Sequence, residues 1–272
     1  MVRNRTVGLA TLFFASLMAI AQSIPAGAAE GLTWVTKKAP SFSGPIVGDG
    51  RGNLYEFSLG NGTALIAFRY SASTNTWSRR ASDPQYGSGG VYFSYITGES
   101  ATLMTDGRII VFGGDDANNI DLPSVAAYNP TTNTWQNLAP LPGGGMYDAT
   151  AVTGPGGKIY AIGGDAGGSS GGEGEITLTS VEAYSPTKNS WQEIAPLSVE
   201  RAFAAAAVGS NGLIYVFGGC NAVQGCSNSD TAEVLNPSNV ANTWSLLPLM
   251  PAETPLVAGV VDPLVERPEV RE

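Results

Sequence analysis

Short apolar runs alternate with glycines and turn-forming residues along most of this chain, in a pattern typical of β-strands. Three of the runs begin at a glycine and end in a glycine pair, at residues 107–114, 157–164 and 212–219. These glycine pairs lie 50 and then 55 residues apart, and a weaker copy without the pair occupies residues 52–60. The recurrence predicts a repeated unit of about 50 residues.

Aromatic residues recur at nearly the same period. The five tryptophans are Trp34, Trp77, Trp135, Trp191 and Trp244. Before three of them a tyrosine stands seven residues earlier, as Tyr128 does before Trp135, whereas the last copy has Leu235 and two extra residues. Asn, Pro, Ser and Thr fill most of the interval, and Asn and Pro there are typical of hairpin turns.

Each repeat therefore predicts four strands. The first is a small apolar run such as residues 202–208, and the second ends at the glycine pair. The third ends at the tyrosine, as in residues 180–184, and the fourth carries the tryptophan. We expect the glycine pair to permit positive φ and close backbone approach where the second strand leaves the sheet.

This combination of glycine pair, tyrosine and tryptophan resembles the kelch repeat, over about residues 31–260. The resemblance implies an all-β fold, a propeller of four-stranded blades. The expected blades occupy about residues 44–80, 100–139, 148–195 and 202–248, with the start of a fifth at residues 255–262. An irregular tail follows at residues 263–272.

Four blades and one unpaired strand around Trp34 make fewer blades than kelch propellers usually have, so we expect an incomplete ring. Three explanations stay open. The chain is a truncated copy of a longer propeller, a small ring of four or five blades, or one part of a ring that another chain completes. Open ends would expose apolar blade faces, which predicts self-association.

The first 29 residues are typical of a cleaved secretory signal peptide. Arg3 and Arg5 precede an uncharged, mostly apolar stretch at residues 7–21, and small residues occupy positions 26–29. A membrane anchor is the alternative, but a span needs about 20 apolar residues. We expect a secreted protein, extracellular or periplasmic, without membrane attachment after cleavage.

Cys220 and Cys226 are the two cysteines of the chain, with five residues between them. In an oxidising compartment this spacing favours a local disulfide. Two free thiols or a redox pair are the alternatives, although redox motifs place their cysteines closer together.

Composition excludes several kinds of chemistry. The chain has no histidine, so it can hold neither a Ser-His-Asp triad nor a His-ligated metal. Its formal charge is −9, and nucleic-acid binding proteins are usually basic. We therefore predict no catalytic triad, no metal, no cofactor and no nucleic-acid partner.

The resemblance implies that one rim carries the loops after the glycine pairs and the crossovers into the next inner strand. The candidate binding residues are Arg201, Glu200, Tyr147, Asp148, Asp115, Asp116, Asp165, Arg79 and Arg80. The loop at residues 115–121 is rich in oxygen ligands, but it lacks EF-hand spacing and its residues are common in turns.

Kelch propellers include both binding proteins and enzymes, so the fold does not decide the function. We expect a noncatalytic module that binds a protein or glycan ligand through its rim loops. The alternative is a sugar epimerase or mutarotase, similar to sialic-acid-handling kelch proteins and using Glu200 and Arg201. Copper chemistry like that of galactose oxidase is excluded because that site needs histidine. An inactive fragment of a longer propeller is the remaining possibility.

Overall fold

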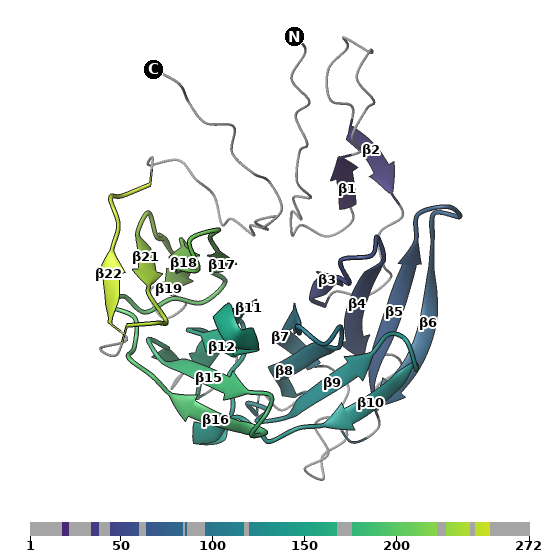
Figure 1. Cartoon of the computed structure of the whole chain (residues 1–272), viewed down its shortest axis with the longest axis horizontal. Helices are drawn as coiled ribbons and strands as arrows, with labels where there is room; N and C mark the ends of the chain where they lie inside the picture. The colour runs from purple at the N-terminus through teal and green to yellow at the C-terminus, as the bar shows by residue number, and fades with distance from the viewer. Residues whose placement is uncertain are drawn as a thin grey trace.

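The computed structural model arranges four four-stranded antiparallel sheets as blades in an open arc (Figure 1). The residues that it describes are 18–21, 34–37, 44–59, 64–83, 85, 96–116, 120–167, 176–221, 227–239 and 243–250. In each blade the first strand lies nearest the centre of the arc and the fourth lies at the outside. The all-β propeller fold with an open ring is thereby confirmed.

The strands follow the chain order expected from the repeats. Blade 1 contains β3 (Ile46–Gly48), β4 (Leu54–Leu59), β5 (Leu65–Ser71) and β6 (Thr76–Asp83). Blade 2 contains β7 (Ile96–Leu103), β8 (Ile109–Asp116), β9 (Val125–Asn129) and β10 (Thr134–Asn137). Blade 3 contains β11 (Thr150–Thr153), β12 (Ile159–Ile162), β15 (Val181–Ser185) and β16 (Ser190–Glu193). Blade 4 contains β17 (Ala205–Val208), β18 (Ile214–Phe217), β21 (Ala232–Leu235) and β22 (Trp244–Leu246).

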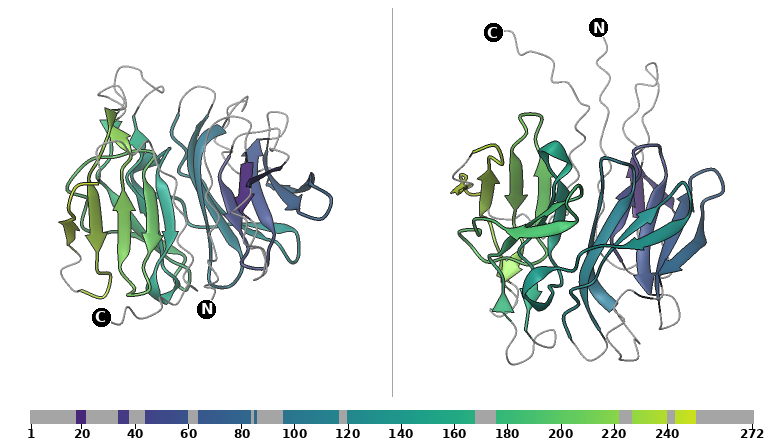
Figure 2. Two further views of the ribbon diagram at one scale, coloured as in Figure 1. Left: turned by 90° about the horizontal axis from the view of Figure 1, so that it is seen from above. Right: turned by 60° about the horizontal axis from the view of Figure 1, so that its bottom comes forward.

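Short hairpins extend blades 3 and 4 beyond their glycine pairs. In blade 3, β13 (Asp165–Ala166) pairs with β14 (Ile176–Thr177), and in blade 4, β19 (Cys220–Asn221) pairs with β20 (Ser227–Asn228). Figure 2 shows the blades from the side, with their strands running between the two ends of the molecule. The helical residues within the described ranges form two three-residue 3₁₀ turns, Pro142–Gly144 and Pro155–Gly157, which are far too short to cross a bilayer.

One detail at the N-terminus differs from the expectation. The strand at Trp34–Lys37 (β2) is paired rather than unpaired, because β1 (Met18–Ala21) runs antiparallel to it. The register places Ala21 opposite Trp34, as Tyr128 lies opposite Trp135 in blade 2. An open strand edge leaves backbone N–H and C=O groups without hydrogen-bond partners. Here the apolar strand β1 provides those partners for β2.

The second strands of blades 2 and 3 send alternate side chains to the blades on their two sides. On β8, Ile109 and Val111 pack toward blade 1, whereas Ile110 and Phe112 pack toward blade 3. On β12, Ile159 belongs to the same cluster as Phe112. Side chains alternate along a strand, so a strand between two blades must be apolar at every position. This explains the unbroken apolar runs before the glycine pairs.

A Tyr–Asn–Trp clamp joins blade 2 to blade 1. Asn133 lies in the turn after β9 with a left-handed backbone, at φ 57°. Its Oδ1 accepts hydrogen bonds from the Tyr128 hydroxyl at 2.8 Å and from the Ala81 N–H of blade 1 at 2.9 Å. The Trp135 indole N–H donates to the Ala81 carbonyl at 2.9 Å. The Trp135 ring also packs edge-on against Phe57 of blade 1, with centroids 5.7 Å apart.

The same clamp joins blade 3 to blade 2. Asn189 accepts from the Tyr184 hydroxyl at 2.8 Å and from the Ala139 N–H at 2.9 Å, and Trp191 donates to the Ala139 carbonyl at 2.9 Å. Blade 4 keeps the tryptophan bond, from Trp244 to the Ala195 carbonyl at 3.0 Å. Leu235 takes the tyrosine place there, opposite Trp244 on β22.

Asn133→Gly tests the clamp, because glycine retains the left-handed backbone but removes the shared acceptor. We expect a loss of unfolding free energy of about 1–3 kcal/mol, the usual cost of leaving buried polar groups unsatisfied. Urea unfolding measures it. Thr132→Ala, an exposed change in the same turn, is the control and should leave stability unchanged. An Asn133→Gly variant as stable as the control would contradict the clamp.

Candidate functional site

Two sets of segments lie at the same end of the strands: the loops after the glycine pairs and the crossovers between blades. We call this end of the molecule the rim. The second glycine of each pair reaches the next crossover: Gly114 N–H donates to the Met146 carbonyl and Gly164 N–H to the Arg201 carbonyl, both at 2.9 Å. At Gly113, φ is 74°, and a Cβ would lie 2.3 Å from the Met146 carbonyl oxygen. This close approach requires glycine.

Backbone hydrogen bonds continue from blade to blade where the inner strands begin. Asp148 N–H donates to the Gly98 carbonyl at 2.8 Å, and Phe203 N–H donates to the Asp148 carbonyl at 2.9 Å. All three residues have positive φ, at 71° for Gly98, 53° for Asp148 and 55° for Phe203. Blades 2, 3 and 4 are thereby linked in a row at the rim.

Two further contacts hold the hairpin of blade 3, one from the loop of blade 2 and one from the crossover into blade 3. The Asp121 Oδ2 accepts a hydrogen bond from Gly167 N–H at 2.7 Å. Tyr147 and Asp165 exchange two backbone hydrogen bonds, at 3.0 and 2.8 Å. The rim is therefore a continuous surface built from consecutive repeats.

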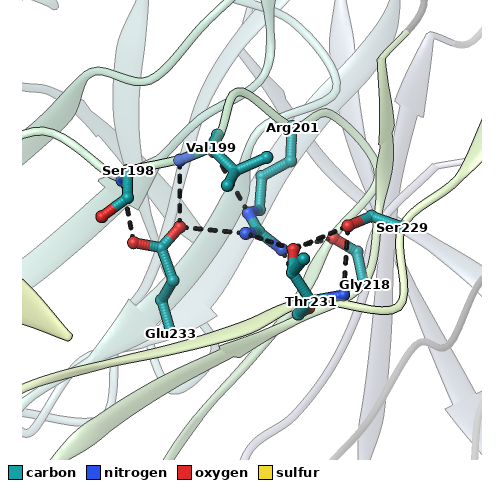
Figure 3. A network of polar contacts seen from close by, with 7 residues as sticks. All are labelled: Ser198, Val199, Arg201, Gly218, Ser229, Thr231 and Glu233. Atoms are coloured by element: carbon teal, nitrogen blue, oxygen red, sulfur yellow. Dashed lines mark hydrogen bonds and ion pairs between the residues drawn. The ribbon is translucent and has the colours of Figure 1, made fainter. Parts of the chain in front are cut away.

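Arg201 lies inside this framework, and its side chain is completely buried (Figure 3). Its guanidinium forms an ion pair with Glu233 at 2.9 Å. Further bonds run to the Gly218 carbonyl at 2.7 Å, to the Thr231 hydroxyl and carbonyl at 2.9 and 3.2 Å, and to the Val199 carbonyl at 3.4 Å. Burial lowers the pKa of Arg201, and the facing Glu233 carboxylate offsets part of that shift.

Glu233 completes the network by binding the crossover itself. Its carboxylate accepts from Ser198 N–H at 2.8 Å and from Val199 N–H at 3.2 Å (Figure 3). The ion pair thus fastens the crossover into blade 4 onto β21. In this structure the N–H groups of Arg201, a predicted ligand contact, are engaged by protein acceptors, and its side chain has no exposed surface.

The other candidate residues of the rim differ in accessibility. Glu200 is exposed and Asp148 is half-buried, so both face solvent at least in part. Tyr147, Asp115 and Asp165 are buried. The structure places Asp116 at the end of β8, and its side chain lies outside the described residues.

Arg79 and Arg80 do not lie at the rim. Both belong to β6, the outermost strand of blade 1, with Arg79 exposed and Arg80 half-buried. We expected them at the rim because the interval from Trp77 to the next turn glycine, Gly107, is long, but most of that interval follows β6. Its aromatic residues at positions 86–95 lie outside the described residues.

The structure describes one of the two cysteines of the predicted disulfide. Cys220 is buried at the start of β19, whereas Cys226 lies outside the described residues. The described ranges contain no free cysteine. They also contain no group of three or more Asp, Glu or Cys side chains placed to hold a metal ion.

Sequence reasoning missed the apolar residues of the rim and two buried acids. Ile120, Ile176 and Phe203 are large apolar side chains that the rim exposes. Glu99 is buried on β7, and burial raises its pKa well above 4.5, with Asp115, Glu56 and Asp148 adding to the shift. A glutamate where the other inner strands have Ala149 and Ala204 was the available signal.

Glu56 is the second buried acid. It lies on β4 with no exposed surface, and neither carboxyl oxygen has a hydrogen-bond partner. Burial raises its pKa from 4.5 to about 7. Its protonated form is therefore favoured by folding.

The chain matches known proteins within its repeats. The family model described as Kelch motif matches residues 98–142, 148–198 and 201–251. Beta-scruin of Limulus polyphemus is 31% identical over 167 residues, which is 61% of this chain and 17% of that protein. Kelch-like protein 33 of Homo sapiens is 32% identical over 123 residues, 44% of this chain and 21% of that protein. The chain thus spans less than a quarter of either relative.

A solved structure, titled "Structure of YjhT", shares the fold. Its TM-score is 0.62 at 17% identity, and the match covers 86% of this chain and 78% of that one.

Arg201→Met tests the structural role of the ion pair. It leaves Glu233 buried without its partner, and we expect the free energy of unfolding to fall by about 3–5 kcal/mol. Adding Glu233→Ala removes the stranded charge and should recover part of that loss, as measured by urea unfolding. Glu193→Gln, at an exposed carboxylate on β16, is the control and should change the free energy of unfolding by less than about 0.5 kcal/mol. A double variant no more stable than Arg201→Met alone would argue against the ion pair.

Glu56 predicts a pH dependence of stability. Since its pKa is higher in the folded chain, its contribution is complete below about pH 4.5 and is lost as the pH rises through about 7. We expect the midpoint temperature of thermal unfolding to decrease as the pH is raised from about 5 to about 8. The decrease should be smaller in Glu56→Gln than in the unchanged chain. Glu193→Gln, at an exposed carboxylate on β16, is the control. Equal falls in both variants would contradict the assignment.

Proposed function

Because the chain belongs to the kelch-repeat family, we propose that it is a noncatalytic module that binds a partner protein through the rim of blades 2 to 4. The observation that carries this proposal is the continuity of the rim. Hydrogen bonds join Gly98, Asp148 and Phe203 across three blades, and Asp121 joins the loop of blade 2 to the hairpin of blade 3. A rigid and broad surface suits protein recognition, because little conformational entropy is lost on binding.

The geometry of Arg201 weighs against the enzymatic alternative. An epimerase that used Glu200 and Arg201 would need both side chains to contact a sugar. Arg201 is buried, and its guanidinium is bound by Glu233 and Thr231. Glu200 alone is exposed. An acid–base pair at these positions is therefore not available, and we favour binding over catalysis.

Export and the disulfide remain parts of the proposal. We propose that residues 1–29 direct secretion and that Cys220 pairs with Cys226 in the oxidising compartment. β1 lies within this leader, so cleavage would remove the strand that pairs with β2. The edge of β2 would then be open to another strand.

The open end of blade 4 supports self-association or addition of a further blade. On β18, Tyr215 and Phe217 form a stacked pair with centroids 6.1 Å apart. Phe217 stands where Phe57 and Phe112 stand in blades 1 and 2, and those two receive Trp135 and Trp191. An aromatic side chain of a neighbouring blade would fit this face in the same way.

Photo-crosslinking from defined positions tests the binding proposal. A photoreactive amino acid replaces Glu200 or Ile176 at the rim, and Thr132 or Asn211 in exposed turns at the opposite end. In its native environment, we expect crosslinks to a protein from the rim positions only. Equal crosslinking from both ends, or none from the rim of the folded protein, would contradict rim binding.

A further inference from the structure

Three large apolar side chains are exposed at the rim. They are Ile120, Ile176 and Phe203, with exposed fractions of 53%, 54% and 46%. One comes from the loop after β8, one from the hairpin of blade 3 and one from the crossover into blade 4. We call this set the rim ledge. Single exposed apolar residues are ordinary, but a group at one end of consecutive repeats indicates a contact surface.

Hydrogen bonds connect the parts of the rim ledge. Ile120 precedes Asp121, whose carboxylate accepts from Gly167, and Ala166 pairs with Ile176 across β13 and β14. One isoleucine of the ledge therefore lies in the short hairpin of blade 3, and the other adjoins a residue bonded to that hairpin.

Phe203 is tied to the same hairpin through the crossover of blade 3. Its N–H donates to the Asp148 carbonyl, and the adjacent Tyr147 is bonded to Asp165 at the start of β13. The ledge is thus held on one framework rather than on independent loops.

The backbone at Phe203 points to a function beyond folding. Its φ of 55° lies in the left-handed region, which bulky residues rarely adopt. Gly98 and Asp148 occupy the equivalent places in the row and suit that conformation better. A half-exposed phenylalanine there carries a conformational cost that burial does not repay.

The charge around the rim ledge is negative. Asp121 and Asp148 are half-buried and Glu200 is exposed, all within the segments that carry the ledge. Among the described residues of blades 2 to 4, Arg201 is the one basic residue at the rim, and Glu233 neutralises it.

The other described basic residues of these blades belong to the opposite end. Arg108 and Lys158 follow the turns between first and second strands, and Lys188 lies in the turn before β16. Charge is therefore distributed unevenly along the strand direction. The rim is acidic, and the other described basic residues of these blades lie at the opposite end.

We propose that the rim ledge docks a cationic protein segment whose apolar side chains pack on Ile120, Ile176 and Phe203 while its lysines or arginines face Asp121, Asp148 and Glu200. This inference rests on the proposed function and names the chemistry of its partner. Apolar anchors within a charged border are the usual anatomy of a protein interface. Charge complementarity would also accelerate association and exclude acidic partners.

Labelled peptides test this proposal on the full chain. The probes are peptides of about ten residues that alternate lysine with leucine, glutamate with leucine, or lysine with serine, and sialyllactose represents an acidic glycan. Fluorescence anisotropy gives the dissociation constant of each peptide, and NMR line broadening reports on the glycan. We expect the lysine–leucine peptide to bind at least about tenfold more tightly than the others, with an affinity that falls as salt is added.

Matched variants separate the rim ledge from general attraction to an acidic protein. The variant Ile176→Ser with Phe203→Asn removes two anchors, and its control, Leu246→Ser, alters a side chain on the outer strand β22 that is 58% exposed. Glu200→Lys is matched by Glu193→Lys, at an exposed acid on the outer strand β16. We expect about a tenfold loss of lysine–leucine affinity in each rim variant and less than about twofold in each control.

Each alternative outcome is informative. Equal losses in rim and control variants would overturn the ledge, because attraction would then be nonspecific. Preference for the glutamate–leucine peptide, lost in the rim variants, would overturn the cationic partner but leave rim binding of proteins intact. Binding of sialyllactose alone would overturn both this inference and the proposed function.

Discussion

The structure depends on one repeated joint, the Tyr–Asn–Trp clamp between neighbouring blades. Apolar burial alone would let two sheets slide past each other, since it is not directional. The clamp fixes their register, because one asparagine oxygen accepts from a hydroxyl of its own blade and from a backbone N–H of the next. The indole bond from Trp135 to the same Ala81 adds a second constraint. The clamp therefore sets the register of blades 1 to 3.

The opposite end of each blade is held by different means. There the glycine pairs allow backbone to meet backbone, as Gly113 does with Met146. In blade 4 a buried ion pair between Arg201 and Glu233 fastens the crossover as well. The blades are thus secured at both ends of their strands, while rim side chains such as Glu200 and Ile176 are exposed to solvent.

The fold could be read from the sequence because its signals are local. Apolar runs, a glycine pair and a Tyr-to-Trp spacing all lie within one repeat, and together they predict the four-stranded blades that the structure has. The role of Arg201 could not be read in this way, because its partner Glu233 lies 32 residues away on another strand. The pairing of β1 with β2 was hidden behind a segment that also suits a leader peptide. Ile120 and Ile176 gave no signal, since exposure depends on neighbours from other repeats.

The clamp has a consequence for how such chains arise. Blades 2 and 3 carry the asparagine and tryptophan that reach backward and the alanine that receives the following repeat, as Asn133, Trp135 and Ala139 do in blade 2. A duplicated gene segment of this length therefore brings both halves of a compatible interface, and copies can be gained without new mutations. Blade 4 differs in this respect. Pro248 stands four residues after Trp244, at the position where the other three blades have alanine. Its carbonyl could still accept an indole, but it has no N–H for an asparagine. A copy added after blade 4 would therefore attach through the tryptophan bond without the asparagine bond.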